Sequence, residues 1–260
     1  MIHPTAIIHP KAKLAKNVSV GPYCVIGPEV TIGASTVLHA HVVVQGQTVI
    51  GEENEIYSFT VLGGAPQDLK YKGGARLWIG SRNIIREHVT IHASSSPEHP
   101  TRIGNKCFIM GQVHIAHDCI IGNNVVLTQR AVLGGHVEVG DYANLSGDTA
   151  YHQFVRIGRF AMPGSRALVL RDLPPFSIAV GSPATYLKCN RIALERASFS
   201  PDTIEQIERA LSLLFHPEVT REDAIKQIKA ECCGEEIQEI LAFVESSKRG
   251  LVPLRAKKKA

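Results

Sequence analysis

The stretch that decides the fold is residues 103–135, IGNKCFIMGQVHIAHDCIIGNNVVLTQRAVLGG, in which an apolar residue returns at every sixth position. The series continues in this phase without a break to Ile157, and an earlier series of aliphatic residues runs from Ile2 to Leu62. Neither a helix, with a period of about 3.6, nor an isolated strand, with a period of about 2, places one apolar residue in six. The period is typical of a β-helical solenoid.

Three such hexads make one triangular coil of about 18 residues, and successive coils stack about 4.8 Å apart. We therefore predict an all-β fold, a left-handed parallel β-helix built from hexapeptide repeats. The fifth residue of each hexad is usually small or apolar and should also point inward. Cys24, Cys107 and Cys119 occupy that place, which predicts that they are small buried hydrophobic residues rather than reactive thiols.

Two segments break the period and predict inserted loops, at about residues 63–78 and 93–102. The first contains GGAPQDLKYKGG and the second SSSPEHP, both rich in turn residues. Loops that project from a rigid scaffold often carry function. We predict a β-helix over residues 1–185 and a helical domain over residues 186–260, in which Ser200 and Thr220 are candidate N-caps. These helices should cap the open end of the solenoid.

Composition narrows the classes of function. The chain has 260 residues, a formal net charge of +4 and 44% hydrophobic residues, as expected of a globular protein. No apolar run is long enough to span a membrane and no signal peptide is visible, so we predict a cytoplasmic protein without membrane insertion. The basic cluster from Arg255 to Lys259 is interpreted as a solvated tail, without nucleic-acid binding. Six cysteines without CxxC spacing argue against disulfides and a zinc–thiolate site.

Residues 18 apart should stack on the same face of the solenoid, and this rule gathers several polar groups into one patch. Counting from His117 gives Gly135 and then Gln153, and the patch also takes in His114, Asp118, His136 and His152. An imidazole can accept a proton from a hydroxyl and return it to a leaving group near neutral pH. A glycine can bring its N–H close to a developing oxyanion. No serine or cysteine nucleophile stands out, which favours direct transfer of a group.

Five segments resemble the characteristic segments of the UDP-N-acetylglucosamine O-acyltransferase family, and the resemblance runs from Ile2 to about Phe199. They are Ile115-Ala116-His117-Asp118-Cys119, Gly134-Gly135-His136-Val137, Tyr151-His152-Gln153-Phe154, Gln67-Asp68-Leu69-Lys70-Tyr71 and Ile85-Arg86-Glu87-His88-Val89-Thr90-Ile91-His92. The resemblance implies a homotrimer with active sites between neighbouring solenoids. It implies transfer of a (3-hydroxy)acyl chain from acyl carrier protein to the 3-hydroxyl of UDP-N-acetylglucosamine, the first step of lipid A biosynthesis, without a metal or other cofactor.

The resemblance also implies roles for individual residues. His117 is the expected general base, Asp118 orients it and the Gly135 amide stabilises the oxyanion. His114 is expected to contact the hydroxyl of the acyl chain. The sugar nucleotide is expected to contact Gln67, Asp68, Lys70, His136, His152 and Gln153, and its uridine and phosphate end to lie near Asn190 and Arg196.

Two departures from the family pattern bear on these expectations. Ser165 stands where well-known members carry a glycine beside the acyl tail, so the length of the acyl chain stays open. Ala197 replaces the second of two adjacent arginines, which leaves open how the carrier protein or the phosphates are contacted. Arg156, Arg159, Arg166 and Arg171 form either a basic surface for the acidic carrier protein or an ordinary solvated face.

Three alternatives remain from the sequence. A zinc-dependent hexapeptide carbonic anhydrase would use the clustered histidines as ligands, although the inserted loop with Asp68 and Lys70 suits a large anionic substrate better. The related N-acyltransferase of the same pathway usually carries an extra N-terminal domain, whereas here the repeat starts at Ile2. A purely structural solenoid would explain the period but not the histidine patch.

Overall fold

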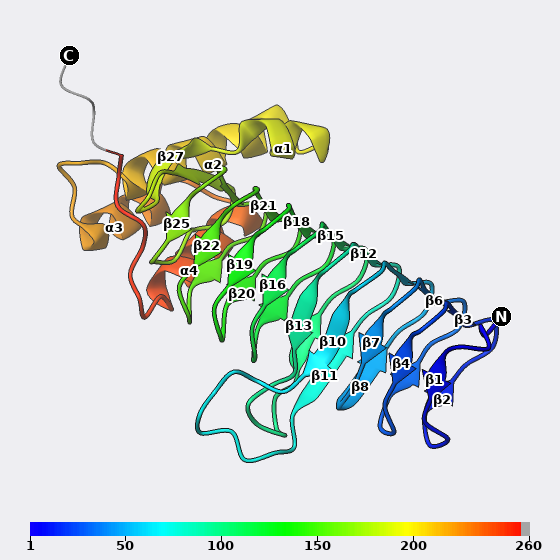
Figure 1. Cartoon of the computed structure of the whole chain (residues 1–260). Coiled ribbons are helices and arrows are strands. Elements are labelled where there is room, and N and C mark those ends of the chain that lie inside the picture. The colour runs from blue at the N-terminus through cyan, green and yellow to red at the C-terminus, as the bar shows by residue number, and fades with distance from the viewer. Residues whose placement is uncertain (256–260) are drawn as a thin grey trace.

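The computed structural model describes residues 1–255, so the part of the predicted basic tail beyond Arg255 lies outside the described residues. The chain winds into a three-sided solenoid that begins at the N-terminus and ends against a group of helices (Figure 1). Each side is a parallel sheet whose neighbouring strands come from successive coils. The predicted left-handed parallel β-helix is confirmed.

The nine-stranded side consists of β1 (Ile7–Ile8), β4 (Val25–Ile26), β7 (Val43–Val44), β10 (Val61–Gly64), β13 (Thr90–His92), β16 (His114–Ile115), β19 (Val132–Leu133), β22 (Ala150–Tyr151) and β25 (Leu168–Val169). The eight-stranded side consists of β2 (Lys13–Leu14), β5 (Thr31–Ile32), β8 (Gln47–Ile50), β11 (Arg76–Ile79), β14 (Thr101–Ile103), β17 (Ile120–Ile121), β20 (Glu138–Val139) and β23 (Arg156–Ile157). The seven-stranded side consists of β3 (Ser19–Val20), β6 (Val37–Leu38), β9 (Glu55–Ile56), β12 (Ile84–Ile85), β15 (Phe108–Ile109), β18 (Val126–Leu127) and β21 (Asn144–Leu145).

The sixth-position residues fill the interior of the solenoid. In each two-residue strand one side chain points out and the other points in, as at Val25 and Ile26, because successive side chains of a strand face opposite ways. The inward positions stack coil upon coil into a continuous column of Ile, Leu and Val. Cys24, Cys107 and Cys119 are buried in this core as predicted.

The corners between the sides use backbone in the left-handed region. One non-glycine residue at most corners has a positive φ, including Asp118, His136 and Phe154 at 60°, 60° and 64°. These three residues lie one above the other on the edge where the nine-stranded side passes to the eight-stranded side. We call this corner the loop edge, and it also carries His117, Gly135 and Gln153.

Both inserted loops leave the solenoid from the loop edge and project on the same side of the molecule (Figure 1). The first runs between β10 and β11, over residues 65–75, and the second between β13 and β14, over residues 93–100. Both are shorter than the breaks in the hexad period suggest, because the flanking strands extend into them. The two loops touch, since a Cβ added at Gly74 would lie 3.3 Å from Cβ of Pro97.

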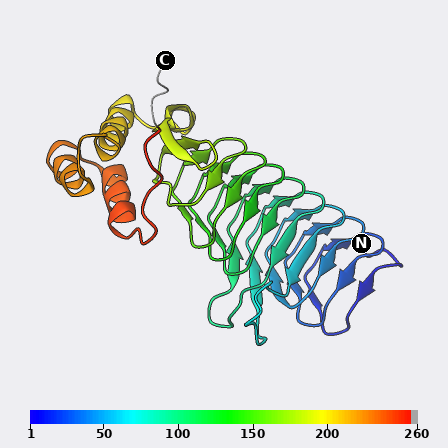
Figure 2. The same cartoon turned by 60° about the vertical axis from the view of Figure 1, so that its left-hand side comes forward.

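The end of the solenoid is covered by a small sheet and four helices (Figure 2). The sheet consists of β24 (Met162–Pro163), β26 (Ser177–Val180) and β27 (Thr185–Cys189), and the helices are α1 (Arg191–Arg196), α2 (Pro201–Leu214), α3 (Arg221–Glu231) and α4 (Glu235–Glu245). Ser200 and Thr220 cap α2 and α3 as predicted, each side chain accepting a backbone N–H. The chain then returns to the solenoid, where Leu251 pairs with Asp172. None of the helices in the described chain has the length and apolar character to cross a bilayer.

Candidate functional site

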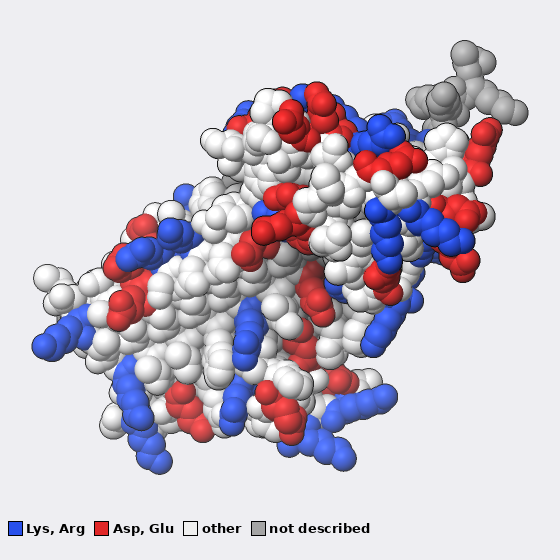
Figure 3. Space-filling view, turned by 180° about the vertical axis from the view of Figure 1, so that it is seen from behind, with Lys and Arg blue, Asp and Glu red and all other residues white. Residues whose placement is uncertain are grey.

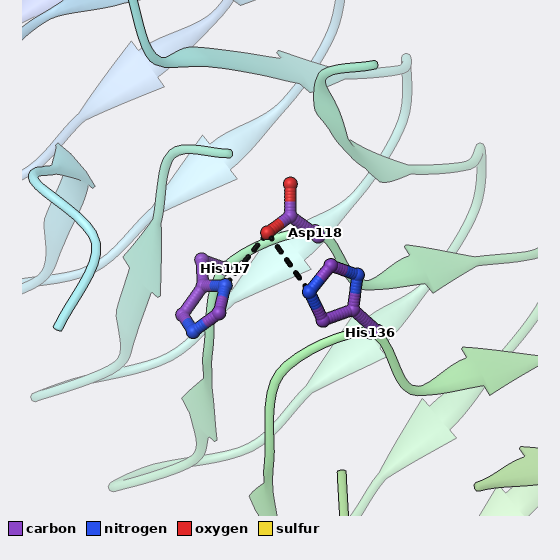
Figure 4. Close-up of side chains that lie close together, drawn as sticks. All are labelled: His117, Asp118 and His136. Atoms are coloured by element: carbon purple, nitrogen blue, oxygen red, sulfur yellow. Dashed lines mark hydrogen bonds and ion pairs between the residues drawn. The ribbon is translucent and has the colours of Figure 1, made fainter. Parts of the chain in front are cut away.

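The stacking of coils brings three polar side chains together on the loop edge. His117 and Asp118 form the corner between β16 and β17, and His136 belongs to the corner one coil further on. The His117 and His136 rings lie 5.4 Å apart, edge to face. Figure 4 shows both rings turned toward the carboxylate of Asp118.

The Asp118 carboxylate organises this cluster. Its Oδ2 lies 2.6 Å from Nδ1 of His117 and 3.4 Å from Nε2 of His136. Its Oδ1 accepts a hydrogen bond of 2.9 Å from the backbone N–H of Ser95 in the second loop. The Asp118 N–H in turn donates to Oγ1 of Thr101 at 2.8 Å. Both the carboxylate and the backbone of this residue are therefore held in place.

This arrangement determines how the His117 ring is used. Burial alone would raise the pKa of Asp118, but the hydrogen bonds from His117 and Ser95 outweigh it and lower that pKa below its ordinary value. The ionised carboxylate can only accept, so Nδ1 of His117 donates to it. The neutral ring then keeps its lone pair on Nε2, which is the atom left to accept a proton from another molecule.

Gly135 lies directly against the free side of that ring. A Cβ added at Gly135 would lie 2.7 Å from Cε1 and 2.9 Å from Nε2 of His117, distances that real Cβ atoms do not adopt. No acceptor within residues 1–255 is in hydrogen-bond reach of the Gly135 N–H. The Gly135 N–H, a free hydrogen-bond donor, and Nε2 of His117, a proton acceptor, thus lie next to each other, as acyl transfer requires.

A second pair of imidazoles lies on the outer face of the nine-stranded side, next to this corner. The rings of His114 and His92 are 4.9 Å apart, and Nδ1 of His114 is 2.7 Å from Oγ1 of Thr90. Burial lowers the pKa of both histidines, and for His92 the charges of His114 and His117 lower it further. The buried Nδ1 of His92 has no hydrogen-bond partner in the described chain.

The remaining residues of the predicted patch are exposed and do not contact the cluster. His152 and Gln153 are exposed one coil beyond Gly135, and Nδ1 of His152 is 3.1 Å from the Gln153 carbonyl oxygen. His152 has no direct contact with the other three histidines of the patch among the interactions in the described residues. Phe154, in contrast, stacks on His136 with 4.4 Å between ring centroids.

Six other predicted residues lie away from this cluster within one chain. Gln67, Asp68 and Lys70 are on the first loop, where Oδ1 of Asp68 accepts the Lys70 N–H at 2.9 Å. Asn190 is buried, and its side chain donates to the Phe160 carbonyl on the edge between the eight- and seven-stranded sides. Arg196 is exposed in the last turn of α1, and Ser165 is exposed on the edge between the seven- and nine-stranded sides.

Reasoning from the sequence missed four residues that touch the cluster: Thr90, His92, Ser95 and Thr101. The second loop explains the omission, because it adds residues to one coil. Thr90 therefore pairs with His114 in the register of β13 and β16, which is 24 residues away in sequence rather than 18. Alignment of the hexads on Ile91 and Ile115, instead of a constant step, would have placed Thr90 and His92 in the patch.

The two buried cysteines Cys119 and Cys107 offer no nucleophile. Cys119 is buried directly behind the site, and burial raises its pKa to about 12. Burial likewise raises the pKa of Cys107 to about 11. Thiols in this state are not attacking groups at neutral pH.

The cluster also has a composition that could hold a metal ion. One ligand atom each from His117, Asp118 and His136 lies within 4.8 Å of the others. Imidazole nitrogens and a carboxylate oxygen are a donor set that suits zinc. The geometry of these three residues is therefore compatible both with binding a metal ion and with transferring a proton.

Comparisons with known proteins identify the relatives of this chain. Residues 172–252 match the family model described as Udp N-acetylglucosamine O-acyltransferase, Domain 2, and residues 100–135 match Bacterial transferase hexapeptide (six repeats). The acyl-(acyl-carrier-protein)–UDP-N-acetylglucosamine O-acyltransferase of Burkholderia lata is 45% identical over 96% of this chain and 98% of its own length. The enzyme of that name from Myxococcus xanthus is 47% identical over the same shares. A UDP-N-acetylglucosamine acyltransferase structure from Bacteroides fragilis superposes with a TM-score of 0.95 at 35% identity, covering 97% of this chain and all of that one.

Proposed function

Because the chain belongs to the UDP-N-acetylglucosamine O-acyltransferase family, we propose that His117, Asp118 and Gly135 form its catalytic centre. The reaction moves an acyl chain from acyl carrier protein to the 3-hydroxyl of UDP-N-acetylglucosamine, the first step of lipid A biosynthesis. The observation that carries the assignment is the 2.6 Å contact between Nδ1 of His117 and Asp118. This contact leaves Nε2 free beside the Gly135 N–H.

The proposed reaction proceeds by direct transfer. Nε2 of His117 takes the proton of the sugar 3-hydroxyl as its oxygen attacks the thioester carbonyl carbon. The Gly135 N–H donates to the oxyanion that forms, and the Asp118 carboxylate stabilises the imidazolium. When the intermediate collapses, the carbon–sulfur bond breaks and the thiolate takes the proton from His117. An ester and a free carrier thiol result.

The remaining residues are proposed to bind the two substrates, one set the sugar nucleotide and the other the acyl chain. Gln67, Asp68, Lys70, His136, His152 and Gln153 would hold the sugar nucleotide, with Asn190 and Arg196 at its uridine and phosphate end. His114 would contact the acyl hydroxyl, and Ser165 would limit the acyl tail. Asn190 lies on a different edge of the solenoid from His117 in one chain. A single chain therefore does not assemble the whole pocket.

A homotrimer would supply the missing side, with each pocket formed between two neighbouring solenoids. The outer face of the nine-stranded side supports this, because Ile7, Val25 and Val132 are 67%, 40% and 45% exposed. Exposed apolar side chains on one sheet face favour burial against another copy. Figure 3 shows a further stretch of solenoid surface that is largely uncharged, with acidic and basic side chains along its edges and around the helices.

A cytoplasmic location and catalysis without a cofactor complete the proposal. All six cysteines are free, and Cys232 and Cys233 are adjacent without bonding, which suits a reducing compartment. The zinc-dependent and N-acyl alternatives lack a supporting relative among the proteins compared above, which are named as O-acyltransferases or UDP-N-acetylglucosamine acyltransferases.

Replacement of the base tests the assignment. His117→Ala should retain the fold and lower kcat by about 10²–10⁴-fold, the usual contribution of a positioned base. The matched control is His216→Ala, at an exposed position after α2, which should keep the wild-type rate. Full activity of the His117 variant would overturn the proposed mechanism.

A further inference from the structure

The outer face of the eight-stranded side carries one continuous row of side chains from β8 to β23. Strand pairing places on successive coils Val49, Trp78, Arg102, Ile120, Glu138 and Arg156. Helix α4 packs on this face at Arg156, which we call the covered end, whereas the stretch from Val49 to Ile120 is the open end. In Figure 1 α4 lies beside β20, and β8 and β11 lie further toward the N-terminus.

The covered end shows which chemistry this face binds. Helix α4 presents Glu239 and Phe243, which are four residues apart and therefore lie on one side of the helix. The Arg156 guanidinium lies over the Phe243 ring at 4.4 Å, and Arg159 forms an ion pair of 2.8 Å with Glu239. Two of the arginines considered from the sequence thus hold a helix that offers a carboxylate and an aromatic ring.

The open end repeats part of this surface three coils earlier. Residues 102–104 and 156–158 are both Arg-Ile-Gly, and the strand register puts Arg102 and Arg156 in the same row. In both copies the isoleucine is buried, the arginine points outward and the glycine leaves the surface beside it without a side chain. The surface that holds α4 therefore has a second copy, and only solenoid residues line the trough beside it.

A trough of about 390 Å³ runs along the open end and is largely apolar. Its lining includes Val49, Trp78 and Ile120, which are 44%, 43% and 47% exposed, and the glycines Gly80 and Gly104. Ile120 also lines the trough beside α4. The open end therefore continues directly into the surface on which the helix packs.

The open end also carries a cation without a carboxylate. The Arg102 guanidinium lies over the Trp78 ring at 4.7 Å, and no carboxylate in residues 1–255 lies within 4.0 Å of it. Glu138, the one carboxylate of the row, already lies 3.5 Å from Arg156. An apolar trough beside an unpaired guanidinium suits an apolar side chain that is accompanied by a carboxylate.

We propose that the open end docks an acidic amphipathic helix of a partner protein. That helix presents a carboxylate to Arg102 and, four residues away, an apolar side chain to the trough between Trp78 and Ile120. The way in which this chain holds its own α4 favours a helix over a lipid surface, because a trough rather than a flat face receives it. The inference goes beyond the proposed function, whose catalytic residues lie on the loop edge.

The probe is the free peptide of α4, residues 234–246, titrated into the whole protein. Trp78 is the only tryptophan of the chain and the peptide contains none, so its emission reports on the open end alone. The emission should shift saturably, with a Kd on the order of 10⁻⁴ M because so short a helix is only marginally formed in water. Peptide that displaced α4 from its own place would leave the emission unchanged, since Arg156 lies four coils from Trp78.

Charge reversal tests the ion pair from both sides. A peptide with Glu236→Lys and Glu239→Lys should bind about tenfold more weakly than the natural peptide. Arg102→Glu should weaken binding of the natural peptide by a similar factor and strengthen binding of the reversed one. Lys13→Glu is the matched control, because Lys13 is exposed on the same side in β2, and it should bind as wild type does.

Val49→Gln provides a second variant that leaves every charge in place. It makes one wall of the trough polar at an exposed position, so it should weaken binding of both peptides while kcat for acyl transfer and Tm keep their wild-type values.

Several results would overturn the proposal. Unchanged Trp78 emission at millimolar peptide would do so, as would equal affinities of the two peptides or of wild type and Arg102→Glu. Vesicles of phosphatidylglycerol and phosphatidylcholine form the last arm of the test. A shift of Trp78 emission with these vesicles but not with the peptide would assign the open end to a lipid surface and exclude the helix.

Discussion

Gly135→Ala is the most informative single substitution, because one added methyl group meets the ring of His117, the proposed general base. The new Cβ would lie 2.7 Å from Cε1 of His117, whereas ordinary contacts begin at 3.4 Å. The ring must therefore retreat by about 0.7 Å, the difference between the two distances. Gly135 does not have a positive φ, so the backbone itself tolerates alanine.

The displaced ring loses its alignment with both partners. Its 2.6 Å contact with Asp118 is already short, so the ring cannot move without straining that bond or leaving the Gly135 N–H. A misplacement of about 1 Å at reacting groups costs on the order of 10²-fold in rate. We expect kcat to fall about 10²-fold, equivalent to about 2.7 kcal/mol of transition-state stabilisation, with little change in Tm.

The assay is formation of the 3-O-acyl sugar nucleotide under saturating substrates, together with thermal unfolding of each variant. Gly111→Ala is the control, because its added Cβ would meet nothing closer than the Glu87 carbonyl at 3.4 Å. It should keep the wild-type kcat. A Gly135→Ala enzyme that also keeps the wild-type kcat would refute the placement of the base against this glycine.

Three further predictions concern the same cluster, and a fourth concerns the proposed acyl-tail residue. Asp118→Asn keeps the shape of the side chain but loses its charge, so kcat should fall about 10²-fold or more in a folded protein; unimpaired turnover would remove Asp118 from the mechanism. Ser95→Pro removes the N–H that donates to Asp118 and should lower kcat by less than Asp118→Asn does, and an equal or larger loss in a folded variant would contradict this. Burial lowers the pKa of His114 in the folded state, so the unfolded chain binds a proton first and stability should fall as the pH drops below about 6.5; Tm scans of wild type and His114→Asn should show a weaker fall in the variant, and identical slopes would contradict the shift. Ser165→Gly should shift donor preference toward longer acyl chains, and an unchanged preference would show that Ser165 does not limit the tail.

The fold was accessible from the sequence because one physical requirement repeats at every coil. Each hexad must send one apolar side chain inward, as Ile109, Ile115 and Ile121 do, and no other regular structure has that period. The solenoid was therefore predicted correctly. The family was also predicted correctly, but from the resemblance of segments such as Tyr151-His152-Gln153-Phe154 and not from the period. Strand pairing extends β10 past Leu62 to Gly64 and begins β11 at Arg76, ahead of Ile79, so the loop between them is shorter than the break in the period.

The alignment of the proposed catalytic residues was also accessible, since a constant step of 18 residues places Gly135 one coil beyond His117. Thr90 and His92, the partners from the preceding coil, were not predicted. The second loop lengthens that coil, so Thr90 pairs with a residue 24 positions later instead of 18. A backbone donor such as the Ser95 N–H carries no side-chain signal at all. Asn190 lies on another edge of the solenoid, and our proposal brings it to the site only from a neighbouring chain, so no rule that considers a single chain could place it there.

The most direct test of the central claim is acyl transfer from a panel of acyl carrier protein thioesters to UDP-N-acetylglucosamine, with the acylated position determined by NMR. We predict an ester at the sugar 3-hydroxyl, formed by the wild-type enzyme in metal-free buffer and lost in His117→Ala. A product acylated elsewhere, or activity that His117→Ala retains, would contradict the proposal that His117 activates this hydroxyl.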